Sequence, residues 1–286
     1  WRAVPLMRKA TQDMMFVHHV LPFGTAAMLA QKPYVVFLHG MDFWTAEQRL
    51  FKCWLMRRVL RHAHTVVVNT FSLKHHVETL TGRRDVMVCY PQPWIVGSPH
   101  THTNRTRVEL VSVSRLVERK GIQRVLNVLA SDAVLRASCH YMIVGEGDFG
   151  ETLKRMIAEK QLASCVTLTE SSSPEVWKSA YDNADIFVLP TIQREGDREG
   201  FGMVYLEAAT FGVPSIASRV EGVDEAVIDK ETGLLVGDDD ELRRALHALI
   251  EDTHMRERLG QQAYAHVQTF LHRERIFAPL KARFGL

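Results

Sequence analysis

The sequence has few cysteines, and they form no metal-binding motif. Four stand far apart, without a CxxC pair and without a histidine at zinc-finger spacing: Cys53, Cys89, Cys139 and Cys165. Zinc fingers and dense disulfide frameworks are therefore excluded, because both need closely spaced cysteines. The simplest interpretation is four reduced, structural thiols in a cytosolic protein.

Long hydrophobic runs and an excess of one charge are lacking as well. The longest apolar stretches, such as residues 34–38 and 186–189, have the length of a β-strand and fall short of the roughly 18 residues of a membrane span. The 35 basic and 33 acidic side chains give a net charge of +2, which argues against nucleic acid as the main partner. Of the 286 residues, 46% are hydrophobic, enough for the packed cores of about two domains.

Several catalytic motifs are missing. The sequence contains no GxxxxGK[ST] loop, no GxSxG elbow and no HExxH helix, so ordinary P-loop ATPases, serine hydrolases and zinc proteases are excluded. The 14 histidines have no metal-ligand spacing, and Asp182, Asp185 and residues 238–240 stand where helices or turns begin and end. These aspartates are interpreted as caps rather than metal ligands, and no metal or other cofactor is expected.

Short apolar stretches alternate with segments of helical periodicity along the whole chain. They predict strands at residues 14–18, 34–38, 65–69, 86–90, 108–113, 141–144, 166–169, 186–189, 215–217 and 233–236. A proline-rich and polar stretch, 91–107, divides this series in two. Such alternation is typical of parallel sheets covered by helices on both faces. The predicted fold is α/β with two Rossmann-like, doubly wound domains, at residues 1–103 and 104–270.

Residues 48–62 form a predicted helix that is both basic and amphipathic. Leu50, Phe51 and Trp54 occur there beside Lys52 and several arginines. A helix of this kind can lie on a membrane surface. The favoured interpretation is an ordinary helix that covers a sheet and keeps its arginines in water, because it falls within the alternation. Peripheral membrane contact is the alternative.

Polar residues and glycines follow four of the predicted strands, where open parallel sheets bind their ligands: 39–42, 114–121, 145–147 and 190–202. Among them, Arg115 offers a bidentate fork and Lys120 a point charge, and both suit a diphosphate. Gly200 and Gly202 let backbone N–H groups approach a ligand at the start of the next helix. These residues predict a site for a phosphate or for the oxygens of a sugar.

Glu207 is the only charged residue between Gly200 and Pro214. The surrounding helix is apolar nearly all round, which predicts burial, and a buried carboxylate needs a partner. One interpretation is that Glu207 accepts hydrogen bonds from a diol such as a ribose. The other is a structural ion pair with a nearby arginine. The sequence alone leaves both open.

The second half of the chain resembles the retaining GT-B glycosyltransferases of glycosyltransferase family four. The resemblance rests on Val113-Ser-Arg-Leu116, Arg119-Lys-Gly121, Ile143-Val-Gly-Glu-Gly147, Ala184-Asp-Ile-Phe-Val-Leu-Pro190 and, above all, Glu199-Gly-Phe-Gly-Met-Val-Tyr-Leu-Glu207, the E-x7-E signature. In the first half, His39-Gly-Met-Asp42 is similar to the HGxD of the family.

This resemblance implies a cytoplasmic, metal-independent hexosyltransferase of polysaccharide biosynthesis. The donor is a UDP- or GDP-linked sugar, and the acceptor is a glycan or a lipid-linked molecule. Arg115 and Lys120 bind the donor diphosphate, and Glu207 binds the ribose. Glu199 and the backbone of residues 200–202 (Gly200, Phe201 and Gly202) hold the sugar, while His39 lies beside the reacting carbon, so His39 and Glu199 are the catalytic candidates. In this class the final helix, here 271–286, returns to the first domain.

The chain departs from the family pattern at several points. Glu221 stands where the family has glycine and Asp224 where it often has proline, which predicts an altered donor pocket. The family begins with βα units of roughly 30 residues each, and the sequence is expected to lack two or more of them. Two alternatives to transfer therefore stay open: a donor-binding module without turnover, and a nucleotide-sugar epimerase.

Overall fold

The computed structural model describes residues 3–9, 13–100, 106–193 and 200–285, which form two compact units. Unit 1 comprises Trp1–Pro91, Gln193–Phe201 and Arg273–Leu286, and unit 2 comprises Gln92–Ile192 and Gly202–His272. Segment 92–100 therefore groups with unit 2, although the sequence suggested a boundary after residue 103. Hydrogen bonds explain this grouping, because the backbone N–H groups of Trp94 and Gly97 donate to Glu207 and Thr210.

Unit 2 contains a six-stranded parallel sheet with the order β10-β9-β8-β5-β6-β7. Its strands are β5 (Val108–Val113), β6 (Cys139–Val144), β7 (Val166–Thr169), β8 (Ile186–Leu189), β9 (Ser215–Ser218) and β10 (Gly233–Val236). The chain runs outward from β5 to β7 and then returns to start β8 on the other side of β5. Ligands of doubly wound sheets bind at the carboxyl ends of the strands where the order reverses, here β5 and β8.

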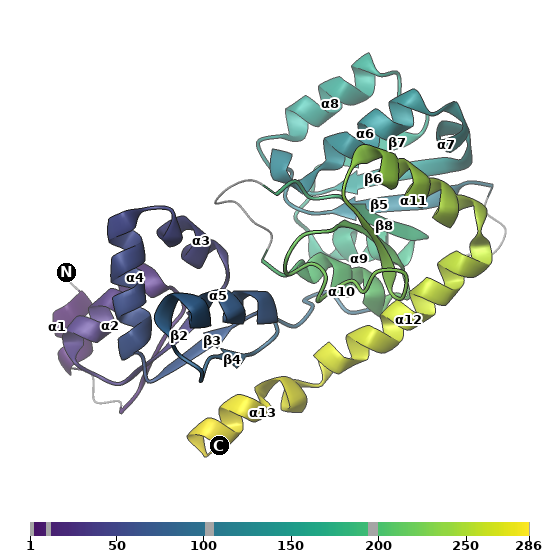
Figure 1. Ribbon diagram of the computed structural model, residues 1–286. Helices are drawn as coiled ribbons and strands as arrows, with labels where there is room; N and C mark the ends of the chain where they lie inside the picture. The colour runs from purple at the N-terminus through teal and green to yellow at the C-terminus, as the bar shows by residue number, and fades with distance from the viewer. Residues whose placement is uncertain (1–2, 10–12, 101–105, 194–199, 286) are drawn as a thin grey trace. The chain divides into compact units, whose positions relative to one another are not determined.

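Seven helices in the described part of unit 2 accompany these strands (Figure 1): α6 (Ile122–Ser131), α7 (Ala133–Ser138), α8 (Gly150–Glu159), α9 (Pro174–Asp182) and α10 (Met203–Thr210) connect strands, and α11 (Asp239–Glu251) and α12 (Thr253–Leu271) follow β10. Local sequence fixes several of their starts. The Ser173 side chain caps α9 next to a proline at its first position, and Asp238 and Asp252 cap α11 and α12. The aspartate cluster at 238–240 thus begins a helix, as the capping interpretation predicts.

Unit 1 contains a four-stranded parallel sheet in the order β1 (Met15–Val17), β2 (Tyr34–Leu38), β3 (Thr65–Val68) and β4 (Met87–Val88). Its helices are α1 (Ala3–Lys9), α2 (Thr25–Ala30), α3 (Met41–Glu47), α4 (Leu50–His62), α5 (Phe71–Thr81) and α13 (Arg273–Phe284). Because the strands are adjacent in chain order, right-handed crossovers place α2, α4 and α5 on one face of the sheet. The buried side chains of Val36, Met56, Val59 and Leu60 join that layer to the sheet.

The final helix, α13, groups with unit 1. The ring of Phe284 lies 5.9 Å from that of Phe16 on β1 and 6.0 Å from that of His64, which directly precedes β3. Phe16 in turn lies 6.2 Å from Phe37 on β2. These aromatic contacts connect the last helix to the strands of unit 1.

The structure confirms the predicted fold class, with two parallel sheets and strands at all ten expected positions. The helices differ from the predictions in two respects. The helix predicted at residues 48–62 is α4, which begins at Leu50 because Arg49 takes an extended backbone conformation, and the preceding helix α3 was not predicted. The short helix α7 was missed. All four cysteines are free thiols, and Cys139 and Cys165 are buried.

Candidate functional site

The loops after β5, β6 and β8 pack against one another through glycines at the carboxyl edge of the unit 2 sheet. Gly121 has a φ of +73°, and a Cβ atom there would lie 1.9 Å from the carbonyl oxygen of Pro190. A Cβ atom on Gly145 would lie 1.8 Å from the carbonyl oxygen of Ser114. No other residue fits these positions without moving backbone. The edge where the strand order reverses is therefore a tightly fixed backbone surface.

Arg115 and Lys120 occupy the loop that follows β5 on this edge. Arg115 is exposed, and its guanidinium has no partner among the described side chains. Lys120 ends a short 3₁₀ turn, Glu118–Lys120, and is only 8% exposed. The backbone N–H of Ile192 donates to the carbonyl of Arg119 at 2.7 Å, which ties this loop to the one after β8. Both predicted diphosphate ligands are thus held on the loop beside the β5 and β8 ends.

Thr191 is a residue of this edge that the sequence reasoning did not select. It directly follows the Pro190 carbonyl that contacts Gly121, and it is 3% exposed. Its hydroxyl oxygen is buried and has no hydrogen-bond partner in the part of the chain that the structure describes. A buried hydroxyl without a partner is unfavourable, so this position suits a ligand that supplies one. Its place one residue beyond the Pro190 of the motif was the only sequence signal.

Gly202 begins α10 and takes the left-handed conformation, with a φ of +79°. A Cβ atom there would lie 2.5 Å from the ring of Tyr205, whose hydroxyl donates to the carbonyl of Leu189 at 2.7 Å. The tyrosine thus anchors the first turn of α10 to the carboxyl end of β8. The N-terminal N–H groups of this helix consequently lie on the same sheet edge as the two cations.

Glu207 is buried on α10, as its apolar surroundings predicted, with 3% exposure. Its carboxylate accepts hydrogen bonds from the Tyr181 hydroxyl at 2.8 Å and from the backbone N–H of Trp94 at 3.2 Å. Burial raises the pKa of the Glu207 carboxyl, although these hydrogen bonds and one from the backbone of Ile95 oppose the shift.

These contacts bear on the two interpretations of Glu207. Among the described residues no arginine pairs with it, so the proposed ion pair is not the arrangement that the structure shows. A carboxylate has about four acceptor positions, which leaves one for a ribose hydroxyl beside the three donors. Binding to ribose stays a prediction.

In unit 1, His39 directly follows β2 at the carboxyl edge of the sheet. Its backbone N–H donates to the Asp42 carboxylate at 3.1 Å, which explains the spacing of the HGxD-like motif. Its imidazole Nε2 lies 3.4 Å from Nδ1 of His18, which follows the neighbouring strand β1. Partial burial of the ring lowers the pKa of His39; Asp42 opposes this shift and the two histidines His18 and His19 add to it. The lowered pKa favours the neutral form of the imidazole.

Two of the remaining sugar-binding candidates, Gly200 and Phe201, lie in the described part of the chain. Gly200 groups with unit 1, where a Cβ atom on it would lie 3.1 Å from the carbonyl oxygen of His39. Phe201 is 3% exposed, and its ring lies 5.4 Å from that of Tyr90. Glu199 lies outside the described residues, so its predicted contact with the donor sugar stays a prediction.

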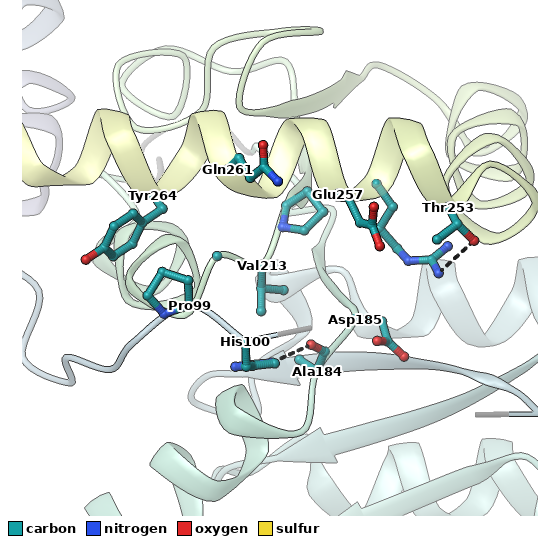
Figure 2. Close-up of a pocket in the computed structure, with 12 residues that line it drawn as sticks. Pro99, His100, Ala184, Asp185, Val213, Thr253, Glu257, Gln261 and Tyr264 are labelled. Carbon is teal, nitrogen blue, oxygen red and sulfur yellow. Dashed lines mark hydrogen bonds between the residues drawn. The ribbon is translucent and has the colours of Figure 1, made fainter. Parts of the chain in front are cut away.

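A cavity of about 380 Å³ lies on the opposite edge of the unit 2 sheet (Figure 2). It is bounded by α12 and by Asp185 and Pro214, which precede β8 and β9. Its cationic side chain, Arg256, donates to the carbonyls of Leu249 and Ile250 and so caps the end of α11. This cavity contains none of the predicted site residues.

Within residues 3–9, 13–100, 106–193 and 200–285, no cluster of three or more histidine, cysteine or acidic side chains has a metal-binding arrangement. Over the same residues, no helix is both long enough and apolar enough to cross a bilayer.

Residues 99–266 match the family described as Glycosyl transferases group 1. This match covers more than half of the chain, and the chain belongs to this family.

Relatives with assigned names share only part of their length with this chain. A GDP-mannose-dependent alpha-(1-6)-phosphatidylinositol monomannoside mannosyltransferase from Mycolicibacterium smegmatis is 35% identical over 158 residues, which is 54% of this chain and 41% of the relative. The amylovoran biosynthesis glycosyltransferase AmsK from Erwinia amylovora is 32% identical over 144 residues, 50% of this chain and 35% of the relative. The chain thus matches about two fifths or less of these relatives.

Solved structures share the fold over nearly the whole chain. HepE from Anabaena in complex with UDP-glucose superposes with a TM-score of 0.80 at 18% identity, covering 100% of this chain and 81% of HepE. Sucrose-phosphate synthase from Thermosynechococcus elongatus gives a TM-score of 0.81 at 19% identity, covering 98% of this chain and 75% of the synthase. These likenesses identify the fold as GT-B.

Proposed function

We propose that this chain transfers a hexose from a UDP- or GDP-linked sugar to a glycan or lipid-linked acceptor, with retention of the anomeric configuration and without a required metal. The observation that carries the proposal is the carboxyl edge at β5 and β8. There a glycine-packed backbone positions Arg115, Lys120 and the unpartnered hydroxyl of Thr191. A diphosphate supplies the negative charge and the acceptor oxygens that suit these groups.

The chemistry follows from the charge that develops as the bond to the sugar breaks. The leaving group is a nucleoside diphosphate, so its growing negative charge must be stabilised. The guanidinium of Arg115, the ammonium of Lys120 and the N–H groups at the start of α10 perform this task in the proposed reaction. His39 is assigned to the reacting sugar, because a neutral imidazole can exchange hydrogen bonds with sugar hydroxyls.

The relatives suggest which donors to test first. One is named as GDP-mannose-dependent, and HepE was solved with UDP-glucose. The acceptor is proposed from the same source, because the relatives include an enzyme for a phosphatidylinositol mannoside and one for the polysaccharide amylovoran.

Calorimetric titration of the whole chain with UDP and GDP tests the nucleotide site. Arg115→Ala is expected to weaken binding roughly ten- to a hundredfold, the effect of a lost charge-assisted hydrogen bond. Arg155→Ala, at an exposed arginine of α8, is the matched control and should leave affinity unchanged. Wild-type affinity in Arg115→Ala would contradict the proposed site.

Assays with GDP-mannose and UDP-glucose separate the alternatives. Release or transfer of the sugar in the presence of EDTA supports a metal-independent transferase, and NMR of the product reports its anomeric configuration. His39→Ala should reduce turnover while nucleotide affinity stays unchanged, whereas Glu207→Ala should weaken nucleotide binding sharply. Nucleotide binding without any release favours the donor-binding module. Interconversion of two nucleotide sugars without an acceptor favours the epimerase.

A further inference from the structure

The outer face of α4 in unit 1 carries large apolar side chains that contribute nothing to the core. The helix packs on the sheet through Met56, Val59 and Leu60, all fully buried. The opposite side exposes Leu50 by 94%, Phe51 by 71% and Trp54 by 54%. The α4 outer face is defined as these three residues together with Arg57, Arg58 and Arg61.

The apolar residues form one patch. At 100° per residue, Leu50, Phe51 and Trp54 fall within about one third of the helix circumference. The rings of Phe51 and Trp54 lie 6.0 Å apart and nearly parallel, with an interplanar angle of 27°. The helix therefore presents a preassembled aromatic and aliphatic surface to water, which is unfavourable unless a partner covers it.

The same face is strongly basic one to two turns further along. Arg57, Arg58 and Arg61 follow the apolar patch, and no acidic residue occurs in Leu50–His62. None of the three arginines forms a salt bridge with a described carboxylate. Arg61 Nε donates to the backbone carbonyl of Thr81 at 2.8 Å, and the guanidinium of Arg58 lies 5.9 Å from the ring centre of Trp54. The face thus joins an apolar patch to positive charge that the structure does not neutralise.

The position of α4 argues against its being covered by additional βα units. Extra strands can join the unit 1 sheet only beyond its edges, β1 and β4. Helix α4 connects the two inner strands and contacts α2 on one side and α5 on the other (Figure 1). Any further helix of that layer would therefore lie outside α2 or α5, and the α4 outer face would stay open.

We infer that the α4 outer face docks unit 1 onto an anionic lipid bilayer. Leucine and aromatic side chains insert at the level of the headgroups, and arginines beside them pair with lipid phosphates. An anionic polysaccharide would use the arginines but would leave Leu50 and Phe51 in water. Because α4 runs antiparallel to the strands, its apolar first turn lies toward the edge that holds His39, and docking brings that edge toward the membrane. The inference rests on unit 1 alone and is independent of the proposed activity.

Cosedimentation of the whole chain with vesicles tests it. We expect binding to phosphatidylcholine vesicles that contain about one third phosphatidylglycerol, weaker binding to pure phosphatidylcholine, and a loss of binding as salt increases. The double variant Leu50→Glu, Phe51→Glu should lower partitioning more than tenfold, and Arg57→Glu, Arg58→Glu should abolish the preference for the anionic lipid. Leu6→Glu, at a leucine of α1 that is 72% exposed, is the matched control and should bind as the wild type does.

Three results would overturn the inference. The first is failure of the wild type to bind either vesicle. The second is equal binding by the double variant and the wild type, with thermal unfolding showing that both are folded. The third is a wild-type dimer that Leu50→Glu, Phe51→Glu converts to a monomer, because the face would then be an interface between two copies of the chain.

Discussion

Units 1 and 2 are built from the same βα repeat, but they differ in how their surfaces are completed. Among the described residues, unit 2 exposes fewer large apolar side chains than unit 1, and it closes its carboxyl edge with glycines that touch neighbouring carbonyls. Unit 1 has fewer strands and leaves Leu50, Phe51 and Trp54 in water. Unit 2 thus combines a largely covered surface with one tightly packed edge, whereas unit 1 presents a large apolar face to water.

The family match follows the same division. Residues 99–266 carry it, and these lie almost entirely within unit 2, whereas the structural neighbours cover 98% of the chain or more. A backbone surface built on close glycine contacts tolerates few sequences, so it leaves recognisable motifs. The described part of unit 1 has no comparable set of close glycine contacts, so its sequence can change while its fold stays the same.

The largest expected effect concerns those glycines. Gly121 and Gly82 share the left-handed conformation, with φ values of +73° and +78°, but only Gly121 lacks space for a Cβ atom. Gly121→Ala should lower the free energy of unfolding by roughly 3 kcal/mol or more, because it adds a backbone clash to the conformational cost. Gly82→Ala in unit 1 should cost about 1 kcal/mol, from conformation alone.

Urea unfolding of both variants measures this difference. Equal losses at the two positions would mean that the loops of unit 2 can move apart freely. The rigidity of the carboxyl edge would then not be a feature that distinguishes unit 2 from unit 1.

Sequence patterns predicted the fold well because their signals are local. The bounds of β7, β8 and β10 agree residue for residue with the strands predicted at 166–169, 186–189 and 233–236. The partners of Glu207 could not be predicted in this way. Tyr181 and Trp94 lie 26 and 113 residues away along the chain, so only the folded structure shows that a hydroxyl and a backbone N–H, rather than an arginine, are the partners of the carboxylate.

The next effect in size concerns this buried carboxylate of unit 2. Since burial raises the pKa of Glu207, its contribution to stability is fully present below its unfolded pKa of about 4.3 and is lost as the pH rises through the folded value. Glu207→Gln keeps the shape without the charge, so the wild type should lose stability relative to it, on the order of 1 kcal/mol, between pH 4 and pH 8. Chemical unfolding of both proteins across that range measures the change. A constant difference would mean that the carboxylate is not desolvated.

The smallest expected effect contrasts two histidines, one in each unit. In unit 2, hydrogen bonds to Asp132 and Glu251 raise the pKa of His247. Its stabilisation is therefore complete below the unfolded pKa near 6.5 and is lost as the pH rises through the folded value. In unit 1, burial lowers the pKa of His39, so its contribution is present above the unfolded pKa and is lost as the pH falls through the folded value.

Acidification from pH 8 to pH 5 should thus change the stability effects of the two histidine substitutions in opposite directions. His247→Gln should become more destabilising relative to the wild type by about 0.2–1 kcal/mol, the range of a partly exposed ion pair. His39→Gln should become less destabilising over the same interval, because it removes a group whose protonation opposes folding. Urea unfolding at the two pH values gives both differences, and NMR titration of the imidazoles gives the two pKa values directly. If the differences in unfolding free energy between variant and wild type change in the same direction for both variants, the opposite environments assigned to these histidines are wrong. A general effect of pH on the chain cancels in each difference, because it acts on the wild type and the variant alike.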